Sequence, residues 1–343
     1  MSVNIRTNLV NNSMWDEWAT LFDSVIYDAD AQQNKYDDIV KALTIEKKSK
    51  RWGEKSIVMG GLGDFVAKSE GEAASQDSFS EGYEKFVQHA SFGLEVQISK
   101  ELKDDNMLDD AKQKVINLVQ AYKRSRAKLA TAAITGAVGD ASTVSFGGAT
   151  IDIKCGDNKA LFNEAHPLKN VEGGTPCNYF SDVLGSNAAV LNKATVKMRN
   201  YRDDRGEVLG FLPDTIVIPG NDPEYEDFVK RIIGSDGEVG SDHNDINTQR
   251  GKWKLVVDPL WTPQISATNH PAIIMSSEAM KALQGIKFYD RTPLDIAVDE
   301  DVHSRNLTYN GFARMSITFP NWRQCMMIGC SDSSTALNTN ESF

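Results

Sequence analysis

One stretch of this chain, residues 104–137, has the apolar spacing of a single very long helix. Its apolar side chains recur at steps of three and four residues, interrupted near Arg126. Asp109 and Asp110 lie in the first turns and basic residues follow, which suits the helix dipole, and Gly136 ends the pattern. The stripe consists of Leu108, Ala111, Val115, Leu118, Tyr122, Leu129 and Ala133. At ~1.5 Å per residue the helix would be roughly 45–50 Å long, so it would form a spine that crosses the molecule.

The first 45 residues contain a shorter aromatic helix pattern. Its apolar side chains can share one helical face; they are Trp15, Trp18, Leu21, Phe22 and Val25. A helix this short cannot bury that face alone. It must pack either on the body of its own chain, as an ordinary core helix, or on a neighbouring subunit, and the residues favour neither alternative.

Residues 46–98 have the composition of extended chain. The run from Gly60 to Val66 is rich in glycine, which resists helix formation, and residues 69–78 are polar and turn-like. Residues 93–99 alternate apolar and polar side chains, the period of a half-buried strand. The pattern predicts a long β-hairpin arm with a mobile acidic tip, although an ordinary surface hairpin fits the same residues.

The remainder predicts a mixed α and β body. Asp222 and Pro223 form an N-cap and first-turn pair typical of a helix start. The predicted helices are 186–200 and the one after Asp222; the predicted strands are 144–153 as a pair, 215–219, 253–259, 272–275 and 312–319. Residues 322–330 are predicted to pair with 312–319. The polar residues 234–251 predict a loop, and 331–343 a loose tail.

Composition excludes several classes of protein. The 343 residues carry a formal net charge of −11, which argues against a whole-protein basic footprint for nucleic acid or an anionic membrane. The N-terminus has no signal-peptide pattern, and no apolar run reaches the ~18 residues of a membrane helix. The four cysteines have no metal-binding spacing, so we expect reduced thiols.

Motifs for catalysis and for cofactor or metal binding are absent, so we predict no catalytic, cofactor-binding or metal site and no cofactor. The five histidines are scattered. Three short clusters have a plainer explanation: Gly60–Gly63 as a mobile loop, Asp242–Asp245 as a solvated loop rather than a metal site, and Asp299–Asp301 as a solvated charge run rather than a cation site. Asp104–Asp105 and Asp203–Asp204 fit caps and turns better than paired acid–base chemistry.

Four short sequences, in this order, resemble one known family. Residues 160–167, with Leu161-Phe162 and His166-Pro167, are similar to the Leu-Phe-x-x-x-His-Pro signature of the major head subunits of Mu-type phages. Residues 203–209 resemble that family's Asp-x-x-Gly-x-x-Leu segment. The strands at 213–219 and 253–261 resemble the two that follow it, and the likeness covers most of residues 80–330 with gaps.

The resemblance implies an α+β capsid fold of the Hong Kong 97 type. Its parts would be an N-terminal arm (1–45), an E-loop hairpin (46–98), a peripheral P-domain (99–159) with the spine helix, an axial A-domain (160–300), a return to the P-domain (301–335) and a loose tail (336–343). Such a chain would be a major capsid protein, not an enzyme. It would self-assemble into hexamers and pentamers of an icosahedral head shell around phage double-stranded DNA, which it would hold without sequence-specific binding.

The implied partners are further copies of the chain, a scaffold protein, a portal and, in some particles, a decoration protein, with no membrane. Because little sequence precedes the arm, we expect a separate scaffold rather than a long cleaved segment. The location would be the virion, after synthesis in the bacterial cytoplasm. The alternatives are an encapsulin-like nanocompartment shell, which would hold a cargo enzyme, and an α/β hydrolase. One branch of the fold cross-links its subunits through a hairpin lysine; Lys68 lies in the arm, but no partner is identifiable and we do not expect a cross-link.

Overall fold

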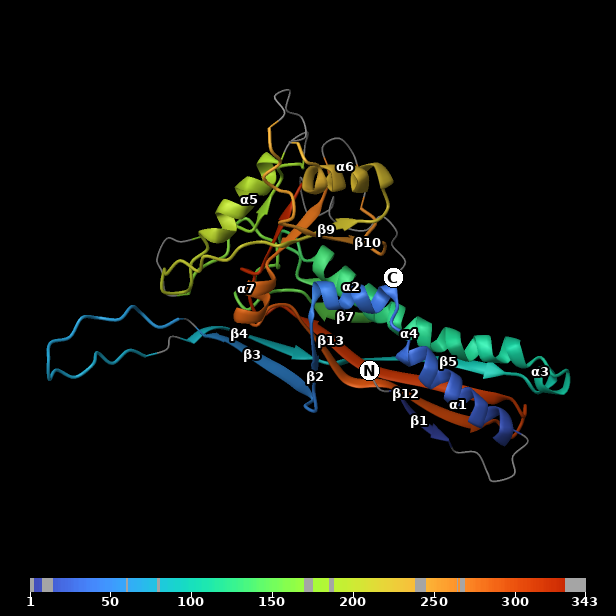
Figure 1. Ribbon diagram of the computed structural model, residues 1–343. Helices are drawn as coiled ribbons and strands as arrows, with labels where there is room; N and C mark the ends of the chain where they lie inside the picture. The colour runs from blue at the N-terminus through green and yellow to red at the C-terminus, as the bar shows by residue number, and fades with distance from the viewer. Residues whose placement is uncertain are drawn as a thin grey trace. The chain divides into compact units, whose positions relative to one another are not determined.

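A computed structural model describes residues 3–7, 15–59, 61–78, 81–169, 175–184, 188–237, 245–263, 265 and 269–330 (Figure 1). The chain divides into two compact units, which are described separately. Unit 1 comprises Met1–Glu54, Val87–Ala130 and Phe288–Ile317; unit 2 comprises Lys55–Phe86, Thr131–Lys287 and Thr318–Phe343.

Unit 1 is built on a five-stranded sheet whose strands come from distant parts of the sequence. Its order is β1-β12-β13-β5, and β2 also pairs with β12. The strands are β1 (Asn4–Thr7), β2 (Ile45–Lys48), β5 (Ala90–Ile98), β12 (Lys287–Glu300) and β13 (Leu307–Thr318). β13 is antiparallel to β5, with Leu307 opposite Ile98 and Met315 opposite Ala90, whereas β1 runs parallel to β12. One face therefore carries the odd-numbered residues of β13, which are mostly buried, and the other carries residues such as Arg314.

Helices cover the buried face of this sheet. They are α1 (Asp16–Ala31), α2 (Lys35–Leu43), α3 (Lys100–Asp104) and α4 (Leu108–Gly136), of which residues up to Ala130 belong to unit 1. Trp15, Trp18 and Phe22 share a hydrophobic cluster with Leu118 of α4 and Tyr309 of β13. The leading helix is thus a core helix of its own chain, the first of the two alternatives left open by its sequence. Leu21, expected on the apolar face, is exposed.

Two cations of α4 are buried inside unit 1. The Arg126 guanidinium lies 2.6 Å from Glu46 and 2.7 Å from Asp290, and Lys123 lies 3.3 Å from Asp37. The Lys123 ammonium also donates to three backbone carbonyls at the end of α1, those of Ala29, Asp30 and Gln32. The interruption of the apolar stripe at Arg126 is therefore a buried ionic cluster that fastens α2, β2 and β12 to α4.

Unit 2 contains a second five-stranded sheet, in the order β10-β9-β11-β14-β8, and two strand pairs, β3-β4 and β6-β7. The sheet strands are β8 (Tyr179–Phe180), β9 (Thr215–Pro219), β10 (Lys254–Asp258), β11 (Ala272–Met275) and β14 (Cys325–Ile328). The pairs are β3 (Gly53–Met59) with β4 (Glu81–Gln88), and β6 (Thr143–Phe146) with β7 (Ala149–Asp152). The helices are α5 (Ala189–Arg199), α6 (Pro223–Gly234) and α7 (Ser277–Ala282).

Most predicted elements are confirmed, including the Asp222 cap, whose carboxylate accepts from the N–H groups of Glu224 and Tyr225. The predicted pairing of the last strand was wrong. Residues 322–330 do not pair with 312–319: β14 is antiparallel to β11 and parallel to β8, in the other sheet, while β13 pairs with β5 in unit 1. The strand β12 was missed entirely.

Among the described residues, no helix is long and apolar enough to cross a membrane.

Candidate assembly site: an exposed arm and its root

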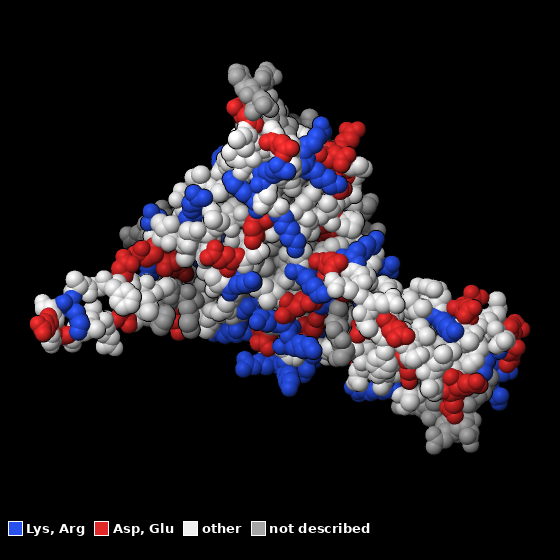
Figure 2. All heavy atoms as spheres, viewed as in Figure 1, with Lys and Arg blue, Asp and Glu red and all other residues white. Residues whose placement is uncertain are grey.

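The strands β3 and β4 and the segment that joins them, residues 53–88, form a hairpin that we call the arm. Its far part, residues 61–78, is the arm tip. β3 and β4 pair with each other and with no other described strand. Every residue of the arm tip is exposed, and it extends away from the rest of unit 2 (Figure 1). Figure 2 shows charged side chains of both signs at its end.

The arm tip exposes apolar side chains that a folded chain ordinarily buries. Phe65 is fully exposed, and Leu62 and Val66 are at least half exposed. Complete burial of a side chain of this size is worth about 1.5–3 kcal/mol. These side chains therefore gain substantial free energy if another surface covers them.

An ion pair holds the near end of the arm tip. Arg205 donates to the two carboxylate oxygens of Asp77 over 2.5 and 2.9 Å, and the Gly63 N–H donates to the same carboxylate over 2.7 Å. These hydrogen bonds, with that of the Ser78 N–H, hold the pKa of Asp77 well below its usual value. Asp203, beside Arg205, accepts from the Gly61 N–H. The turn that the sequence predicts at 203–206 is thus an anchor for the arm.

A second, buried contact fixes the root of the arm. Arg323 donates to Asp204 over 2.7 Å, with both side chains buried. Gly82 of β4 approaches so closely that a Cβ atom there would lie 2.6 Å from the Val58 carbonyl oxygen and 2.8 Å from the Asp204 carboxylate. Only glycine fits at this position without displacing the backbone. The root of the arm is therefore fixed in unit 2 by close packing and a buried ion pair, and it is not a flexible hinge.

Further contacts tie β4 to unit 2. Lys85 is paired with Asp152 of β7 over 2.5 Å, and its side chain is almost completely buried. The Lys169 ammonium donates to the Gly82 carbonyl over 2.8 Å and lies over the Tyr83 ring. Two separate segments of unit 2 thus hold β4, one through the Asp152 carboxylate and the other through the Lys169 ammonium.

His166, in the core of unit 2, packs beneath the root of the arm. Its Nδ1 lies 2.6 Å from Asp157 and its Nε2 3.0 Å from the Asn178 side-chain oxygen. The ring stacks on Trp322 at 4.4 Å, and Arg323, which reaches Asp204, lies over the same indole. The His-Pro sequence is therefore a buried structural node beneath the arm root.

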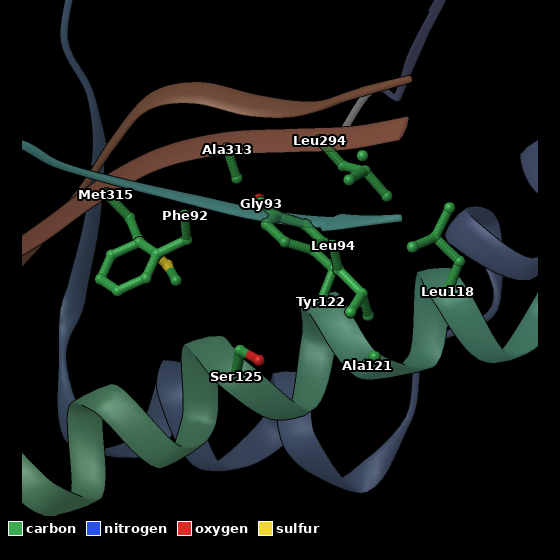
Figure 3. Close-up of a pocket in the computed structure, with 11 residues that line it drawn as sticks. Phe92, Gly93, Leu94, Leu118, Ala121, Tyr122, Ser125, Leu294, Ala313 and Met315 are labelled. Carbon is green, nitrogen blue, oxygen red and sulfur yellow. The ribbon is translucent and has the colours of Figure 1, made fainter. Parts of the chain in front are cut away.

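Unit 1 has a small apolar groove between β5 and α4 (Figure 3). Phe92 and Leu94 of β5 face Ala121, Tyr122 and Ser125 of α4 across a void of about 70 Å³. β5 ends the strand path of its sheet, because β13 is its one partner among the described strands. A void of this size could hold no more than a small apolar side chain.

The clusters weighed from the sequence do not come together as a site. Gly60 and residues 242–244 lie outside the described residues. Asp301 caps a turn by accepting from Ser304 and His303, which lowers its pKa. Among the described residues, no group of three His, Cys, Asp or Glu side chains could hold a metal ion. The Lys68 ammonium donates to the Glu72 carbonyl.

The assignment of Asp77 and Arg205 as the anchor was missed, because 128 residues separate them and no local pattern pairs them. The His166 node was noticed as part of a motif, but its contacts come from Asp157, Asn178 and Trp322. The one signal for it was the aromatic Trp322 two residues after Pro320, which alone has no distinctive meaning.

The sequence matches the family described as "Phage capsid protein" over residues 82–325, more than two thirds of the chain. None of the curated proteins compared with the chain matches it.

Solved structures share the fold at low sequence identity. A structure of Mycobacterium phage Patience aligns over 100% of this chain and 98% of that chain, with 9% identity and a TM-score of 0.54. The capsid of the empty GTA particle aligns over 87% and 91%, with 13% identity and a TM-score of 0.51. The capsid of Ralstonia phage GP4 aligns over 83% and 86%, with 11% identity and a TM-score of 0.50.

Proposed function

The chain belongs to the phage capsid protein family, and from that premise we propose that it assembles with copies of itself into the hexamers and pentamers of an icosahedral head. Its α+β fold is of the Hong Kong 97 type, as the sequence resemblance implied. It is a shell protein of the virion, so its function resides in surfaces that bind other copies rather than in a catalytic centre.

One observation carries this proposal. The arm tip has no buried residue, yet it exposes Leu62, Phe65 and Val66 and is held at its near end by the Asp77–Arg205 pair. An apolar segment that is tethered at its base and left exposed is suited to contact with another molecule. In a closed shell, that other molecule is the neighbouring copy of the same chain.

We assign the subdomains within this proposal as follows. Unit 1, with its sheet and α4, is the peripheral domain, and α1 belongs to it because its aromatic face is in that core. The hairpin arm is narrower than residues 46–98, because β5 pairs with β13. The axial domain ends near Lys287 rather than at 300, because β12 is a strand of the unit 1 sheet.

The finer points of the function are also proposals. The shell would enclose double-stranded DNA without reading its sequence, and would be made in the bacterial cytoplasm with a separate scaffold and a portal, and in some particles a decoration protein. We place the chain nearest to the Mu-type head subunits, and we assign it no enzymatic activity. The ordered motifs support the Mu-type placement, since His166 of the Leu-Phe-x-x-x-His-Pro motif is a buried structural node.

The test is assembly of the purified full chain, with a candidate scaffold supplied. We expect rings or shells of megadalton mass by light scattering and negative-stain microscopy. The matched variant replaces residues 61–78 with a Gly-Ser linker. Because that segment buries nothing within its own chain, the variant should fold normally but fail to form closed particles.

Two results would overturn the proposal. The first is a wild-type chain that stays monomeric at high concentration with scaffold present. The second is a linker variant that assembles as well as the wild type. Particles that contain a cargo enzyme and no DNA would instead support a nanocompartment shell.

A further inference from the structure

Unit 1 carries a concentrated positive charge at the turn that joins β2 to β3. Lys47, Lys48, Lys50 and Arg51 are all exposed within five residues, in a chain whose net charge is −11. Figure 2 shows Lys and Arg side chains gathered at the lower centre of the view, where Figure 1 places this turn. None of the four forms an ion pair among the described residues.

Two arginines of the neighbouring strands extend this charge. Arg291 of β12 and Arg314 of β13 lie on the sheet face opposite α4, since Asp290 and Met315 face the helix side. The Nε atoms of Arg291 and Arg314 are buried without a hydrogen-bond partner. The Ser49 N–H donates to the Asp290 carbonyl, which brings the turn beside Arg291. These six residues, Lys47, Lys48, Lys50, Arg51, Arg291 and Arg314, form what we call the basic patch.

Two acids flank the basic patch in the sequence, and an ion pair neutralises one of them, so one carboxylate faces six cations. Glu46 is paired with Arg126, and Glu54 accepts from the Ser49 hydroxyl. His89 lies between the turn and the two arginines and bonds to Ser49 and Ser316. Burial lowers the pKa of His89, Glu54 opposes that shift, and Arg314 and Arg291 lower it further. The patch therefore has an excess of positive charge.

The arm tip has the opposite charge. Asp64, Glu70 and Glu72 are exposed and form no ion pair among the described residues, whereas Lys68 is the one cation of residues 61–78. The remaining acid, Asp77, is taken up by Arg205. The tip thus presents unpaired carboxylates beside the exposed Phe65 and Val66.

We propose that the basic patch of one copy binds the acidic arm tip of a second copy. The charges are complementary, and both surfaces also expose apolar side chains: Trp52, at the edge of the patch, is 63% exposed, and Phe65 of the arm tip is fully exposed. An aromatic contact surrounded by opposite charges has the anatomy of a protein interface with a polar rim.

Duplex DNA is the other polyanion that could meet this patch. Phosphates would neutralise its cations, but DNA would leave the apolar residues of the arm tip uncovered. The second copy accounts for both surfaces at once. The proposal rests on the proposed function, since it names where one shell subunit holds the next.

Charge reversal tests the proposal. The patch variant is Lys47→Glu, Lys48→Glu, Lys50→Glu and Arg51→Glu, which makes four of the six cations of the patch acidic at exposed positions. The tip variant is Asp64→Lys with Glu70→Lys, at two exposed residues of the arm tip. Each reversal turns attraction into repulsion, so each should raise the protein concentration at half-assembly at least about tenfold. Higher salt should raise that concentration for the wild type as well.

Mixing the two variants gives the decisive result. A tip-variant arm carries added lysines and a patch-variant turn carries added glutamates, while the unmodified patch and tip still suit each other. Copies that alternate around a ring of six therefore restore every contact, so the mixture should form hexamers near the wild-type concentration. A ring of five would keep one repulsive contact, so the measured product is the hexamer and not the closed shell. The control variant, Lys41→Glu with Lys281→Glu, reverses two exposed lysines outside the patch and should not need a partner variant.

The outcomes separate this proposal from the function on which it rests. If the wild type does not assemble, the proposed function fails. If the wild type assembles and the reversals have no effect, or mixing does not restore hexamers, the patch does not hold the arm tip. If the patch variant forms intact shells that retain less duplex DNA, the patch binds DNA and our assignment is wrong.

Discussion

Arg126 of α4 and Asp290 of β12 form a 2.7 Å ion pair in the interior of unit 1. Glu46 lies 2.6 Å from the same guanidinium, and Asp37 is 3.6 Å from it. Burial raises the pKa of Asp290, and Arg126 counteracts that rise. The arginine thus places one positive charge beside three carboxylates, of which those of Asp37 and Asp290 are buried.

Replacing Arg126 with Met should destabilise the chain strongly. The substitution removes the shared cation and leaves buried carboxylates uncompensated, which costs about 3–5 kcal/mol of unfolding free energy. The double variant Arg126→Met with Asp290→Asn should recover part of that loss, because it removes one of the stranded charges. Urea unfolding of the three proteins checks this, and an Arg126→Met loss below about 1 kcal/mol would contradict it.

Thr131 and Asp258 make a pH-dependent contribution in unit 2. The Thr131 hydroxyl donates to the buried Asp258 carboxylate over 2.5 Å. Burial raises the pKa of Asp258, and the Thr131 hydrogen bond opposes this rise. A carboxyl with a raised folded pKa favours the fold below its unfolded pKa, and loses that contribution as the pH rises through its folded pKa.

Thr131→Val should therefore cost about 1.5–3 kcal/mol at pH 7, the value of a hydrogen bond to a charged group. The cost should shrink as the pH falls toward 4, because Asp258 becomes protonated and no longer needs the donor. Unfolding curves at several pH values measure this. Thr150→Val, at an exposed position of β7, is the control and should show a small difference at every pH. A gap that stays constant with pH would rule the mechanism out.

The sequence predicted elements whose pattern is local and missed those that depend on distant partners. α4 was predictable because its apolar face repeats over many turns. β12 was not, because Pro293 and six charged side chains obscure its alternation, and its partners β1 and β13 are set by the fold. Arg126 was likewise assigned to the helix dipole, since Glu46 and Asp290 lie far from it in sequence.

Gly82→Ala should loosen the arm root. Its Cβ would lie 2.6 Å from the Val58 carbonyl oxygen, so β3 and β4 must separate, at a cost of about 1–3 kcal/mol. Faster hydrogen exchange of the β3 and β4 amides is the expected signature. Gly234→Ala, where nothing lies within 4 Å, is the matched control and should leave exchange unchanged. Equal exchange in the two variants would show that the close approach does not constrain the arm.

The assembly site was predictable only in outline. The glycine-rich, acidic stretch indicated an arm, and the Asp203–Gly206 turn was evident from its residue types. The contact between Asp77 and Arg205 depends on how unit 2 folds, and no sequence pattern links the two residues. Exposure of Phe65 is similarly a property of the fold, because a phenylalanine is more often buried.

Phe65→Ser separates stability of the single chain from assembly. The side chain is fully exposed, so its removal should change the unfolding free energy of the monomer by less than about 0.5 kcal/mol. If a second copy buries it, the loss at each interface should be about 2 kcal/mol, the scale of an aromatic hot spot. Shells repeat this interface, so the concentration at half-assembly should rise steeply. Val302→Ser, another exposed apolar residue, is the control and should assemble normally. Wild-type assembly by Phe65→Ser would show that the arm tip does not bind its neighbour through this side chain.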